Sequence, residues 1–288
     1  MVINLTEGVI ETPEYNAFVF HGGEVHFKFK NKEFYREHVL TSDEITITTR
    51  IHNSNELMLL ILVVDMLRKD GYRNPIKVLL PYFPYMQADR DFDDGETFSL
   101  KTMGNLLSCL DVQSWVVYDA HSDSTQMALK NIRVISPSEI IKNVISDIDS
   151  ANLGIMSPDN GAYKRVKKII DKIGWEGNFF TANKDRNISS NNIDDINFNV
   201  GDFEGQDLLI IDDICIGGRT FIELAKKLKE KNVGKLYLYV SHGIFAYGLD
   251  PILEYYEGIF TTNSREESES FPTSQQFGVY NIFPLLNK

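Results

Sequence analysis

The residue pattern with the clearest chemistry lies where an apolar segment runs into two adjacent carboxylates. Residues 208–211 are Leu-Leu-Ile-Ile, Asp212 and Asp213 follow directly, and the Gly-Gly-Arg-Thr segment at 217–220 leads into a helical pattern at 221–231. A strand, a glycine-bearing loop and a helix in this order present free backbone N–H groups and the positive end of the helix dipole to an anion. The pattern predicts a phosphate pocket, with the acid pair placed to hold ribose hydroxyls or a metal ion.

An ordinary strand-to-helix turn of an α/β protein has the same outline, so the other strand ends have to distinguish the two interpretations. Three further predicted strands lead into segments that carry charged or amide side chains: PYFPYMQADR at 81–90, DAHSD at 119–123 and SPDNG at 157–161. Ligands of α/β sheets gather beyond the carboxyl ends of the strands. Four such ends in one chain favour a ligand site over a chance turn.

Composition limits the classes of function that this chain can serve. Its 288 residues suffice for two domains, and a net charge of −12 repels nucleic acid rather than attracting it. Cys109 and Cys215 lie far apart, which predicts no disulfide framework and fits a reducing compartment. The first residues show no secretory signal, and the apolar segment 57–67 is too short to span a bilayer. We therefore expect a cytoplasmic protein that binds neither nucleic acid nor membranes.

Strand and helix patterns alternate along the whole chain. The expected strands are 17–20, 25–29, 44–49, 76–80, 115–118, 153–156, 179–181, 208–211, 236–240 and 258–261, and the expected helices are 55–69, 100–110, 138–148, 162–173 and 221–231. Asn53 with Glu56 three residues later is a capping-box variant that predicts the start of the first helix.

This alternation predicts an α/β fold of two similar domains, each a mostly parallel, doubly wound sheet. The predicted domains are residues 1–148 and 149–288. Two polar segments without periodicity, 183–199 and 264–274, are predicted to be mobile loops.

The chain resembles the ribose-phosphate diphosphokinase family, also called phosphoribosyl pyrophosphate synthetases, from about residue 20 to 262. The resemblance rests on eight motifs in order: FHGGE at 20–24, NSNELMLLILVVDML at 53–67, PYFPYMQADR at 81–90, DAHSD at 119–123, SPDNG at 157–161, NKDR at 183–186, IDDICIGGRT at 211–220 and SHGIF at 241–245. It implies two type I phosphoribosyltransferase-like domains. It also implies transfer of the diphosphoryl group of Mg-ATP to the 1-hydroxyl of ribose 5-phosphate.

The resemblance also implies roles for individual residues. Lys184 and Arg186 match the catalytic Lys-x-Arg pair of a loop that folds over the phosphates, and His121 and Asp159 match the ligands of Mg²⁺. The residues matching the ATP site are Phe20, Gly22, Glu24, Gln87, Arg90 and His121. The residues matching the ribose 5-phosphate site are Asp212 and Asp213 for the hydroxyls, and Ile216, Gly217, Gly218, Arg219 and Thr220 for the phosphate. In the family the nucleotide loop is donated across subunits, which implies a homo-oligomer, a dimer or a hexamer.

The chain departs from the family pattern at nucleotide- and phosphate-binding positions. Gly22 stands where the family usually has a carboxylate, Gln87 replaces an arginine, Ala88 replaces a glutamine, and Ile216 and Arg219 stand in the phosphate loop for an acid and a small residue. Two alternatives therefore stay open. One is a phosphoribosyltransferase, which shares the acid-pair loop, and the other is a catalytically impaired regulatory subunit of the synthetase.

Overall fold

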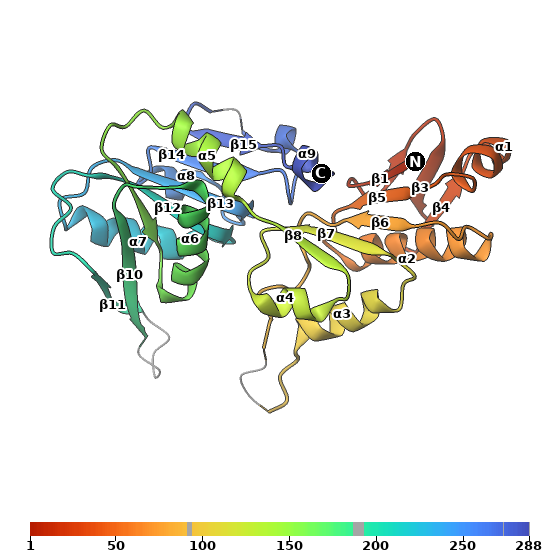
Figure 1. The fold of residues 1–288 in the computed structure, drawn as a ribbon, viewed down its shortest axis with the longest axis horizontal. Helices are drawn as coiled ribbons and strands as arrows, with labels where there is room; N and C mark the ends of the chain where they lie inside the picture. The colour runs from red at the N-terminus through yellow and green to blue at the C-terminus, as the bar shows by residue number, and fades with distance from the viewer. Residues whose placement is uncertain (91–93, 187–192, 273, 288) are drawn as a thin grey trace. The chain divides into compact units, whose positions relative to one another are not determined.

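The computed structural model describes residues 1–90, 94–186, 193–272 and 274–287, without the side chains of 183–195. The chain forms two compact units (Figure 1). The first unit comprises Met1–Ile135 and Phe283–Lys288, and the second comprises Ser136–Ile282. The predicted boundary near residue 148 lies at the end of helix α5, inside the second unit, because α5 (Ser138–Asp147) packs against α6 (Asn160–Ile173).

The first unit is built on a parallel five-stranded sheet in the order β1-β5-β6-β7-β8. Its strands are β1 (Val2–Leu5), β5 (Ile45–Thr49), β6 (Ile76–Leu79), β7 (Ser114–Tyr118) and β8 (Ile132–Ile135). A separate antiparallel sheet of three strands consists of β2 (Ile10–Glu11), β3 (Tyr15–Val19) and β4 (Val25–Phe29). The helices are α1 (Lys32–Phe34), continued by the π-helix Tyr35–Val39, then α2 (Ser54–Lys69), α3 (Ser99–Ser108), α4 (Asp123–Ala128) and α9 (Phe283–Leu286).

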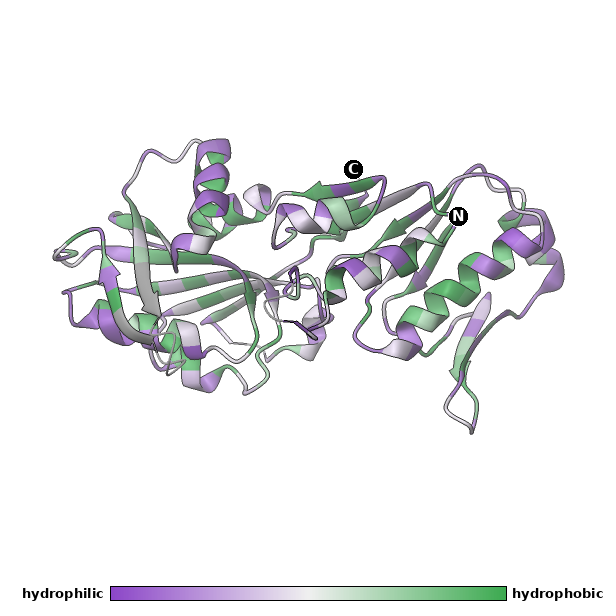
Figure 2. Ribbon diagram, turned by 90° about the horizontal axis from the view of Figure 1, so that it is seen from below, coloured by the Kyte–Doolittle hydropathy of each residue, from purple (hydrophilic) through white to green (hydrophobic). Residues whose placement is uncertain are grey.

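Helix α2 begins as the sequence predicts. The Asn53 side chain accepts hydrogen bonds from the N–H groups of Asn55 and Glu56, and the Glu56 side chain accepts one from the N–H of Asn53. This capping box is confirmed. One side of α2 is apolar and packs into the core of the unit, which is why the helix is so hydrophobic without crossing a membrane (Figure 2).

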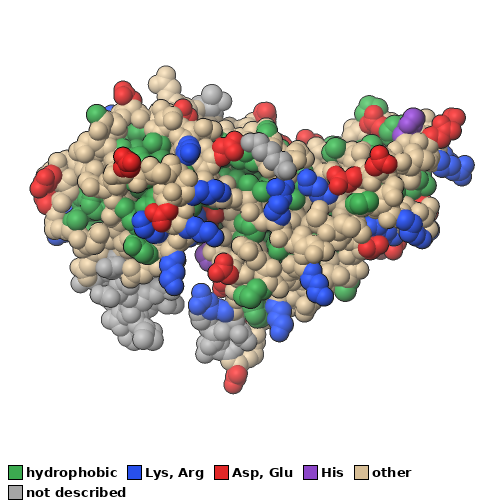
Figure 3. Space-filling view, in the orientation of Figure 1, with side chains coloured by type: hydrophobic (Ala, Val, Ile, Leu, Met, Phe, Trp, Pro, Cys, Tyr) green, Lys and Arg blue, Asp and Glu red, His purple; other side chains and the backbone are tan. Residues whose placement is uncertain are grey.

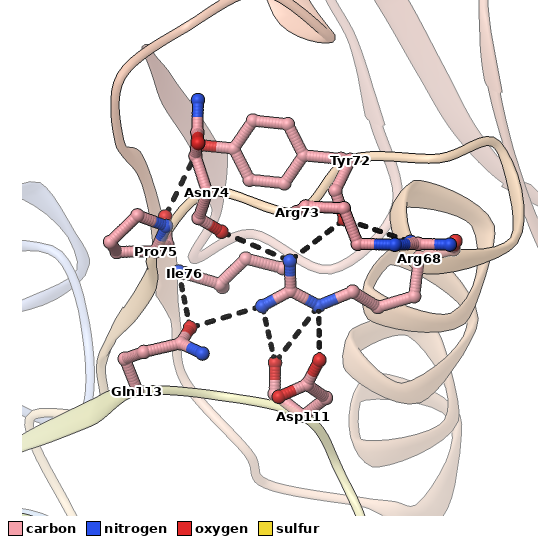
Figure 4. Close-up of polar contacts among 8 residues, drawn as sticks. All are labelled: Arg68, Tyr72, Arg73, Asn74, Pro75, Ile76, Asp111 and Gln113. Atoms are coloured by element: carbon pink, nitrogen blue, oxygen red, sulfur yellow. Dashed lines mark hydrogen bonds and ion pairs between the residues drawn. The ribbon is translucent and has the colours of Figure 1, made fainter.

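The C-terminal end of α2 is fixed to the amino ends of β6 and β7 by one guanidinium group (Figure 4). Arg68 Nη1 donates to the carbonyl oxygens of Tyr72 at 2.9 Å and Asn74 at 3.0 Å. Its Nη2 donates to the carbonyl of Asp111 at 2.8 Å and to Gln113 Oε1 at 3.0 Å, and the same Gln113 oxygen accepts the N–H of Ile76. We call these residues the Arg68 network. It lies at the opposite ends of the strands from the predicted ligand site.

The second unit is built on a seven-stranded sheet in the order β11-β10-β9-β12-β13-β14-β15, parallel except for β11. Its strands are β9 (Leu153–Ser157), β10 (Phe179–Arg186), β11 (Ile193–Phe198), β12 (Asp207–Cys215), β13 (Leu236–Gly243), β14 (Gly258–Thr262) and β15 (Phe277–Tyr280). The remaining helices are α7 (Arg219–Lys229), α8 (Asp250–Leu253) and the 3-10 turn Ser268–Ser270. The predicted α/β class with mostly parallel sheets is confirmed.

Two predicted elements differ from the structure in ways that affect the site. The strand before the acid pair does not stop at Ile211, because pairing with β13 continues through Asp212 opposite Val240 to Cys215 opposite Gly243. Segment 183–199 is not a loop throughout. In this segment β10 continues to Arg186 and pairs antiparallel with β11, with Lys184 opposite Ile196. Both strands continue into polar residues. A prediction that relies on the periodicity of apolar residues does not detect such a continuation.

Candidate active site

The acid pair lies near the carboxyl end of the central strand β12. Both carboxylates are largely buried, with 17% of the Asp212 side chain and 4% of the Asp213 side chain exposed. Adjacent strand residues point to opposite faces, but Asp212 and Asp213 still interact, since the N–H of Asp213 donates to Asp212 Oδ1 at 2.9 Å. Burial and the neighbouring Asp213 raise the pKa of the Asp212 carboxyl to about 8, against the opposing effect of Arg165.

Arg165 joins the acid pair from helix α6. Its Nη2 lies 2.8 Å from Asp212 Oδ1 and 3.8 Å from Asp213 Oδ1, and 16% of its side chain is exposed. The helix faces the sheet through Val166, Ile169 and Ile170, all buried. Arg165 precedes this apolar stripe and so reaches the strand end with its charged group.

The loop after β12 has the geometry expected of a phosphate pocket. Gly218 is the N-cap of α7 with φ +77°, and its carbonyl accepts the N–H groups of Phe221 and Ile222. A Cβ on Gly218 would lie 2.5 Å from Ile252 Cδ1, so only glycine fits both the backbone conformation and the space. The N–H groups of Arg219 and Thr220, the first two residues of α7, precede these hydrogen bonds and can donate to an anion.

Two exposed side chains border this loop. Ile216 is 45% exposed, and Arg219 is exposed at the first position of α7. A cation at the N-terminus of a helix is unfavourable by itself, because it meets the positive end of the dipole. A bound anion would relieve this repulsion, so the position of Arg219 agrees with a phosphate ligand.

Strands β9 and β10 bring further predicted residues to the same end of the sheet. Asp159 is the N-cap of α6, and its Oδ1 accepts the N–H of Ala162 at 2.9 Å. Lys184 and Arg186 lie on β10, two strands from β12 in the sheet order. Their side chains lie outside the described part of the chain.

The predicted residues of the first unit occupy three segments. Phe20, Gly22 and Glu24 form the turn between β3 and β4, where the N–H of Phe20 donates to the carbonyl of Glu24 and Gly23 has φ +92°. The turn joins the two strands that the sequence predicts at 17–20 and 25–29. The Phe20 side chain is 49% exposed and therefore available to a ligand or partner, although its type is one normally found in a core.

The other two segments follow β6 and β7. Gln87 is exposed, and the mostly exposed Arg90 directs Nε to Asp89 Oδ1 at 3.3 Å. His121 is half-buried in the turn before α4. Beside it, the hydroxyls of Ser122 and Thr125 are buried and have no hydrogen-bond partner among the described residues, so water or a ligand can bond them.

The comparisons with known proteins agree with this geometry. A phosphoribosyl transferase domain matches residues 128–272, which include the acid pair, its loop and Arg165. A ribose-phosphate pyrophosphokinase of Pyrococcus abyssi is 30% identical over 208 residues, covering 72% of this chain and 70% of the relative. Another, from Thermococcus kodakarensis, is 29% identical over 224 residues, covering 77% of this chain and 78% of the relative. This chain belongs to the ribose-phosphate pyrophosphokinase family.

A solved structure extends the likeness of fold beyond the matched domain. The phosphoribosylpyrophosphate synthetase of Mycobacterium smegmatis has a TM-score of 0.79, covers 94% of this chain and 87% of its own, and is 21% identical. The same fold therefore runs through both units of this ribose-phosphate pyrophosphokinase family member.

Sequence reasoning did not identify Arg165 or Tyr247. The ring of Tyr247 lies against Gly217, where an added Cβ would come within 2.8 Å of Cε2, and the side chain is 80% exposed. For Arg165 a signal was present, because a basic residue directly before the apolar stripe of α6 can reach the carboxyl end of the adjacent strand. For Tyr247 there was none, since long-range hydrogen bonds, from the N–H groups of Ile244 and Phe245 to the Cys215 carbonyl and from that of Ala246 to the Ile216 carbonyl, place its segment beside the loop after β12.

Proposed function

We propose that this protein transfers the diphosphoryl group of Mg-ATP to the 1-hydroxyl of ribose 5-phosphate, forming phosphoribosyl pyrophosphate and AMP. The observation that carries this proposal is the buried acid pair of β12 leading into a glycine-capped helix, in a chain of the ribose-phosphate pyrophosphokinase family. The 1-hydroxyl oxygen attacks the β-phosphorus of ATP, and the bond from that phosphorus to the α,β-bridging oxygen breaks as AMP leaves.

Ribose 5-phosphate is the ligand for the second unit. Asp212 and Asp213 accept its hydroxyls, while Ile216, Gly217, Gly218, Arg219 and Thr220 hold the phosphate through backbone N–H groups, the Thr220 hydroxyl and the Arg219 charge. This arrangement orients the sugar, because two fixed points at opposite ends of a small molecule leave it little rotational freedom.

ATP and Mg²⁺ complete the reacting complex. We assign the nucleotide to Phe20, Gly22, Glu24, Gln87, Arg90 and His121, and the metal to His121 and Asp159. The described residues contain no cluster of three or more His, Cys, Asp or Glu side chains that could hold a metal without a substrate. The Asp159 carboxylate is the kind of ligand through which Mg²⁺ binds together with substrate phosphates, whose charge the ion neutralises, whereas the His121 imidazole is an uncommon ligand for this ion.

Lys184 and Arg186 are the proposed catalytic residues. Diphosphoryl transfer places negative charge on oxygens around the β-phosphorus, and cations held beside those oxygens lower the barrier. Both residues belong to strand β10, whose backbone pairs with β11.

Two further assignments accompany this function. We propose a homo-oligomer, a dimer or a hexamer, in the cytoplasm. On the face drawn in Figure 3, Lys and Arg side chains are interspersed with Asp and Glu, as on an ordinary protein surface. No helix in the described part of the chain has the length and apolar character needed to cross a membrane.

The proposal is tested by incubating the protein with ATP, Mg²⁺ and ribose 5-phosphate and measuring AMP. We expect AMP only when ribose 5-phosphate is present, and a loss of at least about 10²–10³-fold in kcat for Lys184→Ala with an unchanged thermal unfolding midpoint. Lys69→Met, an exposed change on α2, is the control and should keep full activity. A folded protein that binds ribose 5-phosphate but forms no AMP would instead favour the regulatory subunit, for which Gly22, Gln87, Ala88 and Ile216 argue.

A further inference from the structure

The guanidinium of Arg165 contacts the acid pair at Asp212 Oδ1 and also lies 3.8 Å from Asp213 Oδ1. Asp212 Oδ1 accepts from Arg165 Nη2 at 2.8 Å and from the Asp213 N–H at 2.9 Å. Two donors on the same oxygen fix the rotation of the Asp212 carboxylate about its Cβ–Cγ bond. The other oxygen, Oδ2, is thereby held in one direction.

Two buried carboxylates in contact repel each other, and burial disfavours the charge of each. Asp212 and Asp213 can accept ribose hydroxyls as two anions only if a cation offsets this repulsion. Arg165 supplies that charge from a different element, at 2.8 Å from one acid and 3.8 Å from the other. An arginine cannot lose its proton in this setting, so its charge persists at any working pH.

We propose that Arg165 is a positioning residue for the ribose 5-phosphate site: its charge offsets the repulsion between Asp212 and Asp213, and its hydrogen bond fixes the Asp212 carboxyl group in the orientation in which the pair accepts the ribose hydroxyls. This inference rests on the proposed function. In this role Arg165 does not contact ATP and takes no part in forming the new bond, so replacing Arg165 should affect only the binding of ribose 5-phosphate.

The first test separates binding from turnover. Arg165→Met should raise the KM for ribose 5-phosphate and its calorimetric Kd by about 10–100-fold, the range expected for a lost charge-assisted hydrogen bond. The KM for ATP should stay within about twofold, and kcat at saturating ribose 5-phosphate within about threefold. Arg165→Lys keeps the positive charge but lacks the planar guanidinium with its fixed N–H donors. Its affinity for ribose 5-phosphate should therefore lie between those of Arg165→Met and the wild type.

The second test asks whether Arg165 acts through Asp212. In the Asp212→Asn background, Arg165→Met should weaken binding of ribose 5-phosphate far less than it does in the wild type, because residues that act as a unit are not additive. Independent, additive effects of the two changes would overturn the proposal. Inorganic phosphate, which has no ribose hydroxyls, should bind Arg165→Met and the wild type equally.

The matched control is Lys167→Met. Lys167 lies on the same helix, pairs with Asp171 at 2.7 Å and is exposed to solvent, so its loss should leave the KM and Kd for ribose 5-phosphate unchanged. If the wild type itself fails to bind ribose 5-phosphate, the proposed function is wrong. If the wild type binds and Arg165→Met binds equally well, the proposed function stands and this inference is wrong.

Discussion

The two arginines Arg68 and Arg165 are both largely buried at a strand end, yet their surroundings are opposite in kind. Arg68 directs its N–H groups mainly to neutral oxygens, three backbone carbonyls and the Gln113 amide, and adds the exposed carboxylate of Asp111 at 2.9 Å. Arg165 faces two buried carboxylates. Arg68 is therefore bonded mainly by uncharged groups of the fold, whereas Arg165 is bonded by the side chains of two acids.

The difference separates stability from function. The backbone carbonyls that Arg68 bonds do not ionise, so the Arg68 network needs no ligand to balance its charges. Its role is to hold α2 to the sheet. The acid pair with Arg165 carries a net charge of −1 when both acids are ionised, in a site where burial penalises charge. Perturbed, incompletely compensated groups of this kind concentrate at functional sites.

The largest effect should come from removing the charge of the acid pair. We expect Asp212→Asn with Asp213→Asn to raise the Kd of ribose 5-phosphate by about 10³-fold, or about 4 kcal/mol, because the ribose hydroxyls lose both carboxyl acceptors. Isothermal titration calorimetry measures this Kd directly. Near-normal affinity in a folded double variant would show that the loop after β12 binds another ligand.

Arg68→Met should affect stability instead. We expect the free energy of unfolding to fall by about 2 kcal/mol, since three backbone carbonyls and the Gln113 amide lose a charged donor, while the KM for ribose 5-phosphate stays unchanged. Urea unfolding measures the first quantity and initial rates the second. Lys69→Met on the same helix should remain within about 0.5 kcal/mol of the wild type. A raised KM in Arg68→Met would abolish the distinction between the two arginines.

Sequence alone could predict the elements with strong local signals. The capping box at Asn53, the turn at Gly22 and the glycine loop before α7 follow from local backbone chemistry, and all are present. The second half of β12 could not be predicted in this way, because it forms by pairing with β13, where His242 lies opposite Ile214. Long-range pairing, not local propensity, extends that strand.

In the candidate site, too, the residues that are neighbours in sequence could be predicted, whereas those brought together by the fold could not. A carboxylate pair and a glycine loop adjoin in sequence, so their joint role is visible without coordinates. Arg165 comes 47 residues before Asp212, and only the packing of α6 on the sheet brings the two together. Residues that act through another side chain leave little trace in a motif, because their spacing depends on tertiary structure.

A third prediction concerns the stability of the acid pair without ligand. The pKa of Asp212 is about 8 in the folded state and near 4 when unfolded, so the unfolded state releases its proton first as the pH rises. The wild type should therefore lose stability between about pH 4 and pH 8. Asp212→Asn cannot ionise and should be more stable than the wild type by about 2 kcal/mol at pH 8.5, with little difference at pH 4.5. Thermal unfolding at both values gives the comparison; equal midpoints at pH 8.5 would mean that Arg165 compensates Asp212 fully.

The smallest effect should come from the edge of the Arg68 network. Gln113 Oε1 accepts both Arg68 Nη2 and the N–H of Ile76, but the Gln113 side chain is exposed and water can replace it. Gln113→Ala should therefore lower the free energy of unfolding by only about 1 kcal/mol and leave ribose 5-phosphate binding unchanged. Hydrogen exchange at the Ile76 amide reports the change locally and should accelerate, whereas the exchange of Val78 in the middle of β6 should not. Faster exchange throughout β6 would mean that Gln113, and not the Arg68 guanidinium, fixes the amino end of the strand.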